Sequence, residues 1–484
     1  MRGFVLDEPE LEFGAGGRHI DPRFGLASHG PLDVGTAAAP ERIRVGIVGA
    51  AAAIEGIRSW LGRAREPIAG KPAKYLKQRA LFPDFPGFNS DNAFRSLLVF
   101  DENNMRIISS RAMERIQNDN PARATATLVS AYMEEIAWLA EASRCDVIIC
   151  ARPDWLDSPD RPPSESDADA TSTADGVSES GRPDFHDQLK AAALRFPQPL
   201  QVIRPETWDS TSKPPKGVRR RQVQDPATRA WNLHTALYYK AGGVPWRLIR
   251  SYSDISTCYL GVSFYKSFDG ATVHTSVAQL FNERGEGVVV RGGPAAVLKE
   301  DRQPHLTEQD AAELITATLA AYRMEHRTHP ARLVVHKSSR FANAERSGFL
   351  AGADETHIED CELIWISQSD PARAFRGNEH PPLRGTCLSL ASDRLLVYTK
   401  GSVDFYGAYP GMHVPIPLSL RPVDVRHEPE VLAAEILALT KLNWNHSQLD
   451  AHLPITMHAA NKVKAILRRS TPESTVARRY AHYM

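Results

Sequence analysis

Apolar and amphipathic stretches alternate along the first third of the chain. Short apolar runs, with the length and composition of buried strands, are separated by stretches in which apolar residues recur with helical spacing. The expected strands lie at 42–50, 94–100, 145–151 and 199–204, and the expected helices at 52–64 and 126–142. Because strands that alternate with helices are joined by crossovers, this pattern predicts an α/β fold with a parallel sheet covered by helices on both faces.

The second half of the chain has a different pattern. Consecutive strands joined by short connections predict an antiparallel meander, and a long helical pattern follows at 308–327, where Thr307 suits the N-cap position. The expected strands lie at 257–267, 271–281, 285–292, 332–341 and 360–367. Three meandering strands, a helix and a further strand is the order of the ribonuclease H architecture. This analogy concerns the fold and assigns no function by itself.

The overall composition is that of an ordinary globular protein. At 484 residues, with 42% hydrophobic and 24% charged residues, the chain has room for two or three domains with full cores. Its five cysteines are scattered and form no CxxC pair, so the sequence supports neither a zinc site nor a disulfide framework. The first residues are acidic rather than basic, and no run approaches the roughly 18 apolar residues of a membrane span. We therefore expect a soluble cytoplasmic protein with no membrane contact.

The formal net charge of zero argues against a uniformly basic nucleic-acid-binding protein, so the distribution of charge carries more information. The stretch 157–183 is acidic and rich in serine, with almost no large apolar groups, and it predicts a disordered loop. Outside it the chain is basic, with clusters at 212–222 and 464–480 that could bind phosphate or simply lie in solvent. A glycine turn at 46–56 lacks the GxGxxG spacing of a dinucleotide site, which excludes that function there.

Five motifs stand out in order along the chain. They are EPELEFGAGGRHIDPRFGLASHGPLD, LYYKAGGVPWRL, HPPLRGTCLSL, YPGMHVPIPLSL and LTKLNWNHSQLDAHLPITMHAANKVKAIL. Together they span nearly the whole chain and resemble the motifs of the short prokaryotic Argonautes. The resemblance implies a lead segment at 1–35, a Rossmann-like MID domain at 36–245 and a ribonuclease H-like PIWI domain at 246–484, without the lobe that carries PAZ in long Argonautes.

In that family the MID domain holds the 5′-phosphate of a guide strand with a helix-borne pair of residues and a lysine at the boundary with PIWI. The resemblance assigns the pair to His186 and Lys190, whose spacing of i and i+4 places them on one helix face, and the lysine to Lys240. Ala236 stands where long relatives have a further lysine, and the glutamine of the site has no clear counterpart near 204–208. The resemblance also implies Mg²⁺ at the guide 5′-phosphate as a cofactor.

Each of the three matched residues also has a simpler interpretation. Lys240 ends an apolar helix, where a lysine suits the negative end of the helix dipole, and Gly242 or Gly243 can end the helix. His186 and Lys190 could be an ordinary surface histidine and a solvated helix position. Clustered ammonium and imidazole donors suit a terminal phosphate, which carries more charge than an internal one, and the three positions together favour phosphate binding.

An active PIWI domain cleaves with two metal ions, whose ligands are carboxylates around the scissile phosphate. At the positions that match these ligands the sequence has Ser263, Ser338 and Asn461. A hydroxyl cannot replace a carboxylate at a two-metal site, so we expect a protein that is not a nuclease. The alternative is a metal-dependent ribonuclease H-like nuclease with a rearranged site. Its candidate ligands are Asp254, Asp269, Glu308 and His458.

The resemblance implies a catalytically inactive Argonaute that binds a 5′-phosphorylated guide RNA or guide DNA and pairs it with a complementary single-stranded DNA target. It also implies a partner in which an APAZ domain is fused to an effector, either a TIR domain, a sirtuin-like domain or a nuclease, in defence against invading DNA. The alternative outside this class is a structural scaffold that binds no nucleic acid. Candidate contacts to the nucleic-acid backbone are Lys266, Lys337, Arg340, Arg384, Lys441 and Asn443.

Overall fold

The structure is a computed structural model of the 484-residue chain. It describes residues 2–72, 76–157, 184–209, 224–249, 255–266, 273–281, 287–290, 292–299, 301–368, 370–377, 381–391, 393–411, 413–469, 477 and 479–484. The predicted acidic loop at 157–183 lies outside the described residues except for Asp157, and so does the basic cluster at 212–222. None of the described helices is long and apolar enough to cross a membrane.

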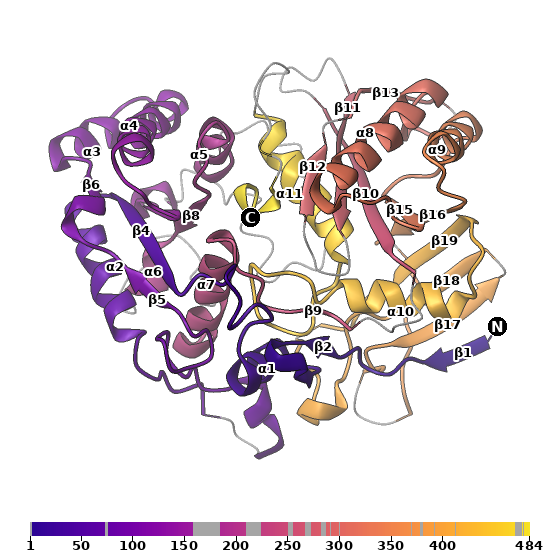
Figure 1. Ribbon diagram of the computed structural model, residues 1–484, viewed down its shortest axis with the longest axis horizontal. Helices are drawn as coiled ribbons and strands as arrows, with labels where there is room; N and C mark the ends of the chain where they lie inside the picture. Colours follow the sequence, from indigo (N-terminus) through magenta and orange to yellow (C-terminus); the bar gives the residue numbers. More distant parts are fainter. Residues whose placement is uncertain are drawn as a thin grey trace.

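The first domain is built on a small sheet, the β4–β8 sheet on the left of Figure 1. Its strand order is β5–β4–β7–β8, with β6 on a second stretch of β4, and every pairing is parallel. The strands are β4 (Arg42–Gly49), β5 (Leu97–Val99), β6 (Met105–Ile107), β7 (Val147–Ala151) and β8 (Leu200–Ile203). The helices are α2 (Ala51–Arg63), α3 (Ser110–Gln117), α4 (Pro121–Ala142), α5 (Phe185–Ala193), α6 (Pro205–Trp208) and α7 (Pro226–Lys240).

Helices cover both faces of the small sheet because neighbouring residues of β4 point to opposite sides. Ile47 packs in one core with Ile57 of α2 and Trp231 of α7. Val48, the next residue, packs in a separate core with Leu128 of α4, where Leu189 of α5 also lies. The parallel sheet with helices on both faces confirms the α/β fold predicted for this part of the chain.

The second domain is built on a large sheet, with the order β1–β17–β18–β19–β16–β15–β10–β11–β13–β14 and β12 paired to β11. The strands are β10 (Thr257–Lys266), β11 (Val273–Phe281), β12 (Gly287–Val290), β13 (Pro294–Val297), β14 (Pro304–His305), β15 (Arg332–Lys337), β16 (Asp360–Ser367), β17 (Thr386–Ala391), β18 (Arg394–Val397) and β19 (Leu418–Asp424). The β10–β11–β12 meander is antiparallel and β15 lies parallel to β10, which confirms the predicted order. The short strands β13 and β14 were not predicted.

Helices also cover both faces of the large sheet. They are α8 (Glu308–His326), α9 (Asn343–Glu355), α10 (Pro429–Leu439) and α11 (Ile455–Leu467). Val262 of β10 packs in a core with Ile315 of α8 and Phe349 of α9. Gly261, on the other face, lies so close to α11 that an added Cβ would stand 2.2 Å from the Thr456 carbonyl oxygen. Thr307 caps α8 as predicted, because its Oγ1 accepts the Asp310 backbone N–H at 3.1 Å.

The lead segment is part of both domains. Its elements are β1 (Arg2–Val5), β2 (Leu11–Glu12), β3 (Arg18–His19) and α1 (Pro22–His29), and β2 also pairs with β9 (Arg247–Leu248). Strand β1 forms the edge of the large sheet against β17. Farther along, Asp33 accepts hydrogen bonds from the Tyr238 hydroxyl at 2.7 Å and the Val244 backbone N–H at 2.9 Å. The segment therefore runs along the lower side of both domains in Figure 1.

Candidate nucleic-acid interface

Helix α5 carries the predicted pair of residues. It begins after Asp184, whose carboxylate accepts the His186 backbone N–H at 3.1 Å, and it buries Lys190 on its inner face. The Lys190 ammonium donates to the backbone oxygens of Leu200 and His482, each at 3.3 Å. Burial, and then the positive charge of Lys462, lowers the pKa of Lys190 to about 7.

Lys240 is the last residue of α7, and it does not cap its own helix. The helix end is closed by backbone bonds from Ala241, and Gly242 follows with a φ of 102° that favours glycine. The Lys240 ammonium instead donates to Oε1 of Gln201, at 2.5 Å, on strand β8. Burial, and then the charge of Lys190, holds the pKa of Lys240 well below its usual range. The Lys240 side chain therefore bonds to β8 rather than to a carbonyl at the end of its own helix.

The two lysines form one cluster, which we call the lysine pair (Lys190 and Lys240). Both side chains are about 1% exposed. Their hydrogen-bond partners are two backbone oxygens and one amide oxygen, all of them neutral. No carboxylate forms an ion pair with either ammonium among the described residues. The structure thus buries two amine groups close together without an ion-paired carboxylate.

His186 lies beside the lysine pair, and its side chain pairs with Asp187. Its Nδ1 lies 2.8 Å from Oδ1 of Asp187, and burial lowers its pKa against the opposing effect of that carboxylate. The helix brings His186 and Lys190 together as the spacing predicted, although His186 is 22% exposed and Lys190 is buried. Its role towards a phosphate stays a prediction.

Two partners of the lysine pair were missed by sequence reasoning. Gln201 supplies an amide oxygen from β8, next to the 204–208 stretch where no glutamine was recognised. His482 supplies a backbone oxygen from the end of the sequence, 292 positions from Lys190. A glutamine on a strand that enters the site was a usable signal. Nothing in the local sequence points to the His482 carbonyl.

The side chains near the lysine pair do not fit a bound Mg²⁺. Asp184, His186 and Asp187 each have a ligand atom within 4.8 Å of the other two. However, His186 and Asp187 bond to each other, and Lys190 adds a positive charge beside them. A hard divalent cation needs several oxygen ligands and is repelled by ammonium groups. The predicted Mg²⁺ at a guide phosphate therefore gains no support from these groups.

The large sheet brings together the positions that the sequence analysis matched to metal ligands. Val262 of β10 is paired with Lys337 of β15, so the next residues of these parallel strands, Ser263 and Ser338, are neighbours. Ser263 Oγ donates to the backbone oxygen of Ala460 at 3.2 Å, and Asn461 follows on α11. The predicted alignment thus has a spatial counterpart, which we call the serine edge (Ser263, Ser338 and Asn461).

Two groups of potential metal ligands are found among the described residues, and neither includes a residue of the serine edge. One is the Asp184 group of the first domain, and the other combines Asp360, Glu362 and His427. Asp360 opens β16 beside the first residue of β15, at the opposite end from Ser338. The Glu362 carboxylate accepts hydrogen bonds from the guanidinium of Arg332 and from two backbone N–H groups.

The structure describes two of the four residues of the alternative nuclease. Asp254 and Asp269 lie outside the described residues. Glu308 is an exposed first residue of α8, where a carboxylate favours the helix N-terminus. His458 lies on α11 with its Nε2 3.4 Å from the side-chain nitrogen of Asn443.

Three of the predicted backbone contacts are buried in ion pairs, so those predictions do not fit the structure. Lys337 is fully buried and lies 2.5 Å from the Glu345 carboxylate. Arg384 and Lys441 both bind Glu8 of the lead segment, at 2.9 and 2.6 Å. A phosphate could reach these groups only by displacing a buried carboxylate.

The remaining candidates differ in exposure. Lys266 and Arg340 have exposed side chains near the ends of β10 and β15, so their backbone contacts stay a prediction. Asn443 is 5% exposed, and its Oδ1 accepts the Asn445 backbone N–H at 3.0 Å. Asn443 therefore has a role within the protein, shaping its own loop.

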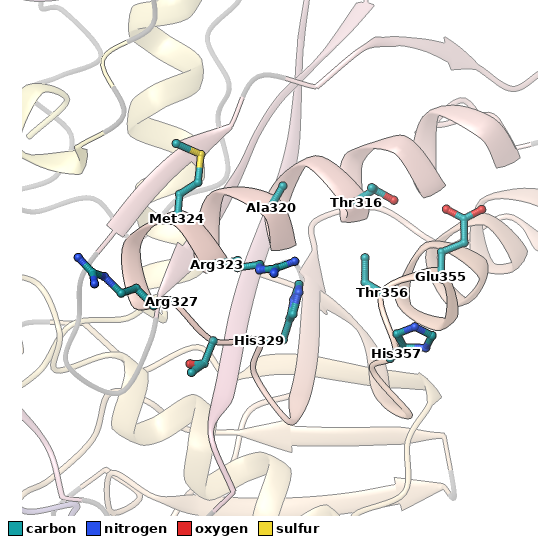
Figure 2. A pocket seen from close by; sticks show the side chains of 10 residues that line it. Thr316, Ala320, Arg323, Met324, Arg327, His329, Glu355, Thr356 and His357 are labelled. Atoms are coloured by element: carbon teal, nitrogen blue, oxygen red, sulfur yellow. The ribbon is translucent and has the colours of Figure 1, made fainter.

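A surface hollow of about 920 Å³ lies between the last turns of α8 and α9 (Figure 2). Arg323 and Arg327 come from the end of α8, and Glu355 ends α9, with His329 and His357 in the segments that follow. These segments lead into β15 and β16, so the hollow lies at the opposite end of these strands from the serine edge. It contains none of the predicted site residues.

Comparison with known proteins gives matches among solved structures alone. No family model and no curated protein matches the sequence. The Argonaute of Clostridium butyricum, solved with a guide DNA and a 19-mer target DNA, matches with a TM-score of 0.62 and 15% identity, over 97% of this chain and 53% of that one. Aa-Ago with externally bound siRNA matches with a TM-score of 0.59 and 16% identity, over 100% and 56%.

This chain therefore spans about half the length of the Argonautes that it matches. The matched part extends over both sheets, since almost all of this chain is covered in each comparison. Identities of 15 and 16% establish the fold rather than a shared activity. The small parallel sheet, the ribonuclease H-like large sheet and this coverage agree with the architecture expected from the sequence: the chain has the MID–PIWI fold of the Argonaute proteins.

Proposed function

We propose that this protein binds the 5′-phosphorylated end of a guide strand at the lysine pair and does not cleave the strand that pairs with the guide. The observation that carries the proposal is the burial of Lys190 and Lys240 with neutral oxygen partners only. A buried charge without a counter-charge is costly, and the cost disappears when an anion binds between the ammonium groups.

The charge of the pair also explains why a strand end would be selected. A terminal phosphate monoester carries about −1.5 to −2 charges at pH 7, whereas an internal diester carries one. Two ammonium groups match the terminal group in charge, and charge-assisted hydrogen bonds are about twice as strong as neutral ones. Gln201, which already bonds to Lys240, can also turn its amide N–H groups towards a phosphate oxygen.

Absence of cleavage is proposed because the serine edge holds two hydroxyl groups and an amide where metal ligands are needed. Neutral hydroxyl and amide groups bring no negative charge to hold two divalent cations. The described carboxylates that could act together lie at the Asp184 group and at the start of β16. The protein would therefore hold and read a strand rather than cut it.

The kind of guide and the downstream effect are further parts of the proposal. The family resemblance favours a guide RNA and a single-stranded DNA target, with base pairing reading the sequence and the protein reading the backbone. One similar structure was solved with a guide DNA and a target DNA, and another with externally bound siRNA. A sensor without its own chemistry needs an effector, for which we propose a partner with an APAZ domain.

One experiment tests both halves of this proposal. The purified protein is mixed with guides that differ only in a 5′-phosphate or a 5′-hydroxyl, then with a labelled complementary strand in Mg²⁺ or Mn²⁺. We expect tighter binding of the phosphorylated guide and no cut product. Product cut at a fixed distance from the guide end, and lost on substitution of a single carboxylate, would establish the rearranged nuclease instead. Equal binding of both guides would overturn the phosphate site.

A further inference from the structure

A short segment after strand β16, residues 370–377, exposes an aromatic ring to solvent. We call it the arginine–phenylalanine segment, and its sequence is DPARAFRG. Exposed and half-buried side chains alternate along it, with Arg373 and Phe375 exposed and Ala372 and Ala374 half-buried. Phe375 is 74% exposed, more than any other large hydrophobic side chain in the described part of the chain. The alternation turns the alanines inward and the phenylalanine outward, the reverse of what burial of apolar surface favours.

Hydrogen bonds to strand β18 and its end hold the backbone of this segment in place. Asp370 is 5% exposed and accepts from Arg394 Nη2 at 2.6 Å and from the Ala372 backbone N–H at 2.9 Å. The Ala374 backbone N–H donates to the hydroxyl of Tyr398, a fully buried residue, at 2.6 Å. The exposed phenylalanine therefore stands on a backbone that is anchored on both sides of the preceding arginine.

Two arginines flank the aromatic ring. Arg373 Nη1 donates to the backbone oxygens of Asp370 at 2.6 Å and Ala372 at 2.8 Å. The Nε of Arg376 has no hydrogen-bond partner among the described residues. Neither guanidinium forms an ion pair with a carboxylate in the part of the chain that the structure describes. The segment therefore presents an aromatic ring between two positive charges that no protein carboxylate balances.

The segment lies at the same end of the large sheet as the serine edge. Strands β15 and β16 are parallel and both end there, and only β19 separates β16 from β18 (Figure 1). The indole N–H of Trp365 on β16 donates to the Ser338 backbone oxygen at 3.2 Å, and the guanidinium of Arg421 lies 4.9 Å from the centre of the same indole. Exposed Arg340 follows β15. The arginine–phenylalanine segment thus extends a set of positive and aromatic side chains that starts beside the serine edge.

We propose that Phe375 is a stacking platform for an unpaired base of a nucleic-acid strand, while Arg373 and Arg376 contact the phosphates of that strand. This inference rests on the proposed function and adds a contact that lies in the PIWI domain, apart from the lysine pair. Surfaces that bind single strands combine aromatic rings, on which bases of any kind stack, with positive charges along the backbone. The two flanking arginines favour a polyanion over a protein segment as the occupant.

The occupant has to be an unpaired nucleotide, because stacking on a side chain needs a free face of the base. Nucleotides in the middle of a guide–target duplex have both faces covered by their neighbours. Unpaired nucleotides occur where the target extends beyond the guide, on either side, or where the guide extends beyond the target. These three sources share one chemistry, and targets and guides of different lengths distinguish them.

The test compares the native protein with Phe375→Ala, both loaded with the same 5′-phosphorylated guide at one fixed salt concentration. The labelled complementary strands end flush with the guide, or extend beyond it at the 5′ end or the 3′ end. A fourth arm uses a target shorter than the guide. We expect one of the unpaired extensions to strengthen binding to the native protein about 5- to 150-fold, and Phe375→Ala to remove that gain. The flush duplex should bind both proteins alike.

An abasic extension is the matched control on the nucleic-acid side, since it keeps the phosphates and lacks the bases. It should bind the native protein as weakly as the normal extension binds Phe375→Ala, and the substitution should then have no further effect. Phe375→Trp should keep the gain. Met324→Ala, at another exposed apolar side chain, should change nothing. Because Phe375 is exposed, Phe375→Ala should keep the native thermal midpoint.

Two sets of outcomes separate this inference from the proposed function. Equal binding of flush and extended strands by the native protein, or an equal gain in Phe375→Ala, would overturn the stacking role in favour of a protein contact at this ring. The preference for a 5′-phosphorylated guide would stay intact in both cases. Loss of that preference in the native protein would overturn the proposed function itself.

Discussion

Four lysine side chains are buried in the described part of the chain, and the two domains treat them differently. In the PIWI domain Lys337 and Lys441 each face a carboxylate, Glu345 at 2.5 Å and Glu8 at 2.6 Å. In the MID domain Lys190 and Lys240 face neutral oxygens. The PIWI lysines are balanced by carboxylates of the protein, whereas the MID lysines are where we propose that an anion binds. Burial of a charge indicates a ligand site only when the counter-charge is missing.

The largest expected effect comes from removing the carboxylate partner of a buried lysine in the PIWI domain. Glu345→Gln leaves Lys337 buried and unpaired, and it also weakens the bond by which Glu345 Oε1 accepts the Leu306 backbone N–H at 3.0 Å. Breaking a buried ion pair from one side costs about 3–5 kcal/mol. We expect a loss of that size in the free energy of unfolding, measured by urea titration.

The matched control lies on the same helix. Glu355, at the other end of α9, is exposed, and we expect Glu355→Gln to change the free energy of unfolding by less than about 0.5 kcal/mol. A similar small effect of both substitutions would mean that the Lys337–Glu345 pair is not structural and would return Lys337 to the list of nucleic-acid contacts.

The second prediction concerns binding at the MID side. Lys240→Ala removes one charge-assisted bond, worth about 1.5–3 kcal/mol, so a 5′-phosphorylated guide should bind about 10- to 150-fold more weakly. A 5′-hydroxyl guide offers no terminal phosphate and should be affected far less. Affinities of both guides at one salt concentration provide the check, with Lys299→Ala, at an exposed lysine, as the control. Equal weakening of both guides would contradict the assignment of the lysine pair.

The same comparison shows what sequence could predict. The central strands of both sheets and the helices α2, α4 and α8 follow from hydrophobic spacing, whereas β17, β18, β19, α9, α10 and α11 were not predicted from it. The two helical lysines of the MID side follow from short motifs. The burial of Lys441 could not be predicted, since its carboxylate partner, Glu8, comes from the other end of the sequence. Local composition marks Lys441 only as a charged residue.

Other features that the sequence did not predict also depend on partners from distant parts of the sequence. Strand β13 has the sequence PAAV and exposed or half-buried side chains, so it has no alternating pattern, and its place is set by pairing with β11 and β14. Gln201 and the His482 carbonyl join the lysine pair through tertiary packing over 39 and 292 positions. Chemistry carried by one helix can be found in sequence, whereas partners brought by distant segments need the structure.

A third prediction concerns stability and has opposite signs in the two domains. Lys240→Met replaces an unpaired buried ammonium with an apolar chain of similar length, so the ligand-free protein should gain about 1–2 kcal/mol. Lys441→Met leaves Glu8 beside Arg384 alone and should destabilise the protein. Urea titration of both variants without nucleic acid measures the difference. Destabilisation by both would show that Lys240 is a structural lysine.

The last and smallest effect is the pH dependence of the ligand-free protein. The pKa of Lys190 is lowered from 10.5 to about 7 by burial, so between pH 7 and 10.5 the unfolded chain binds this proton and the folded protein does not. Stability therefore rises with pH in that window, by at most about 1.4 kcal/mol per pH unit from this group, and falls as the pH falls towards 7. The measurement is the thermal midpoint of the native protein and of Lys190→Met at pH 7 and 8. We expect a rise for the native protein relative to the variant, and a bound 5′-phosphorylated guide should remove that difference because it supplies the missing counter-charge. Parallel pH profiles without guide would mean that Lys190 keeps its proton, and that a negative charge of the protein itself already balances it.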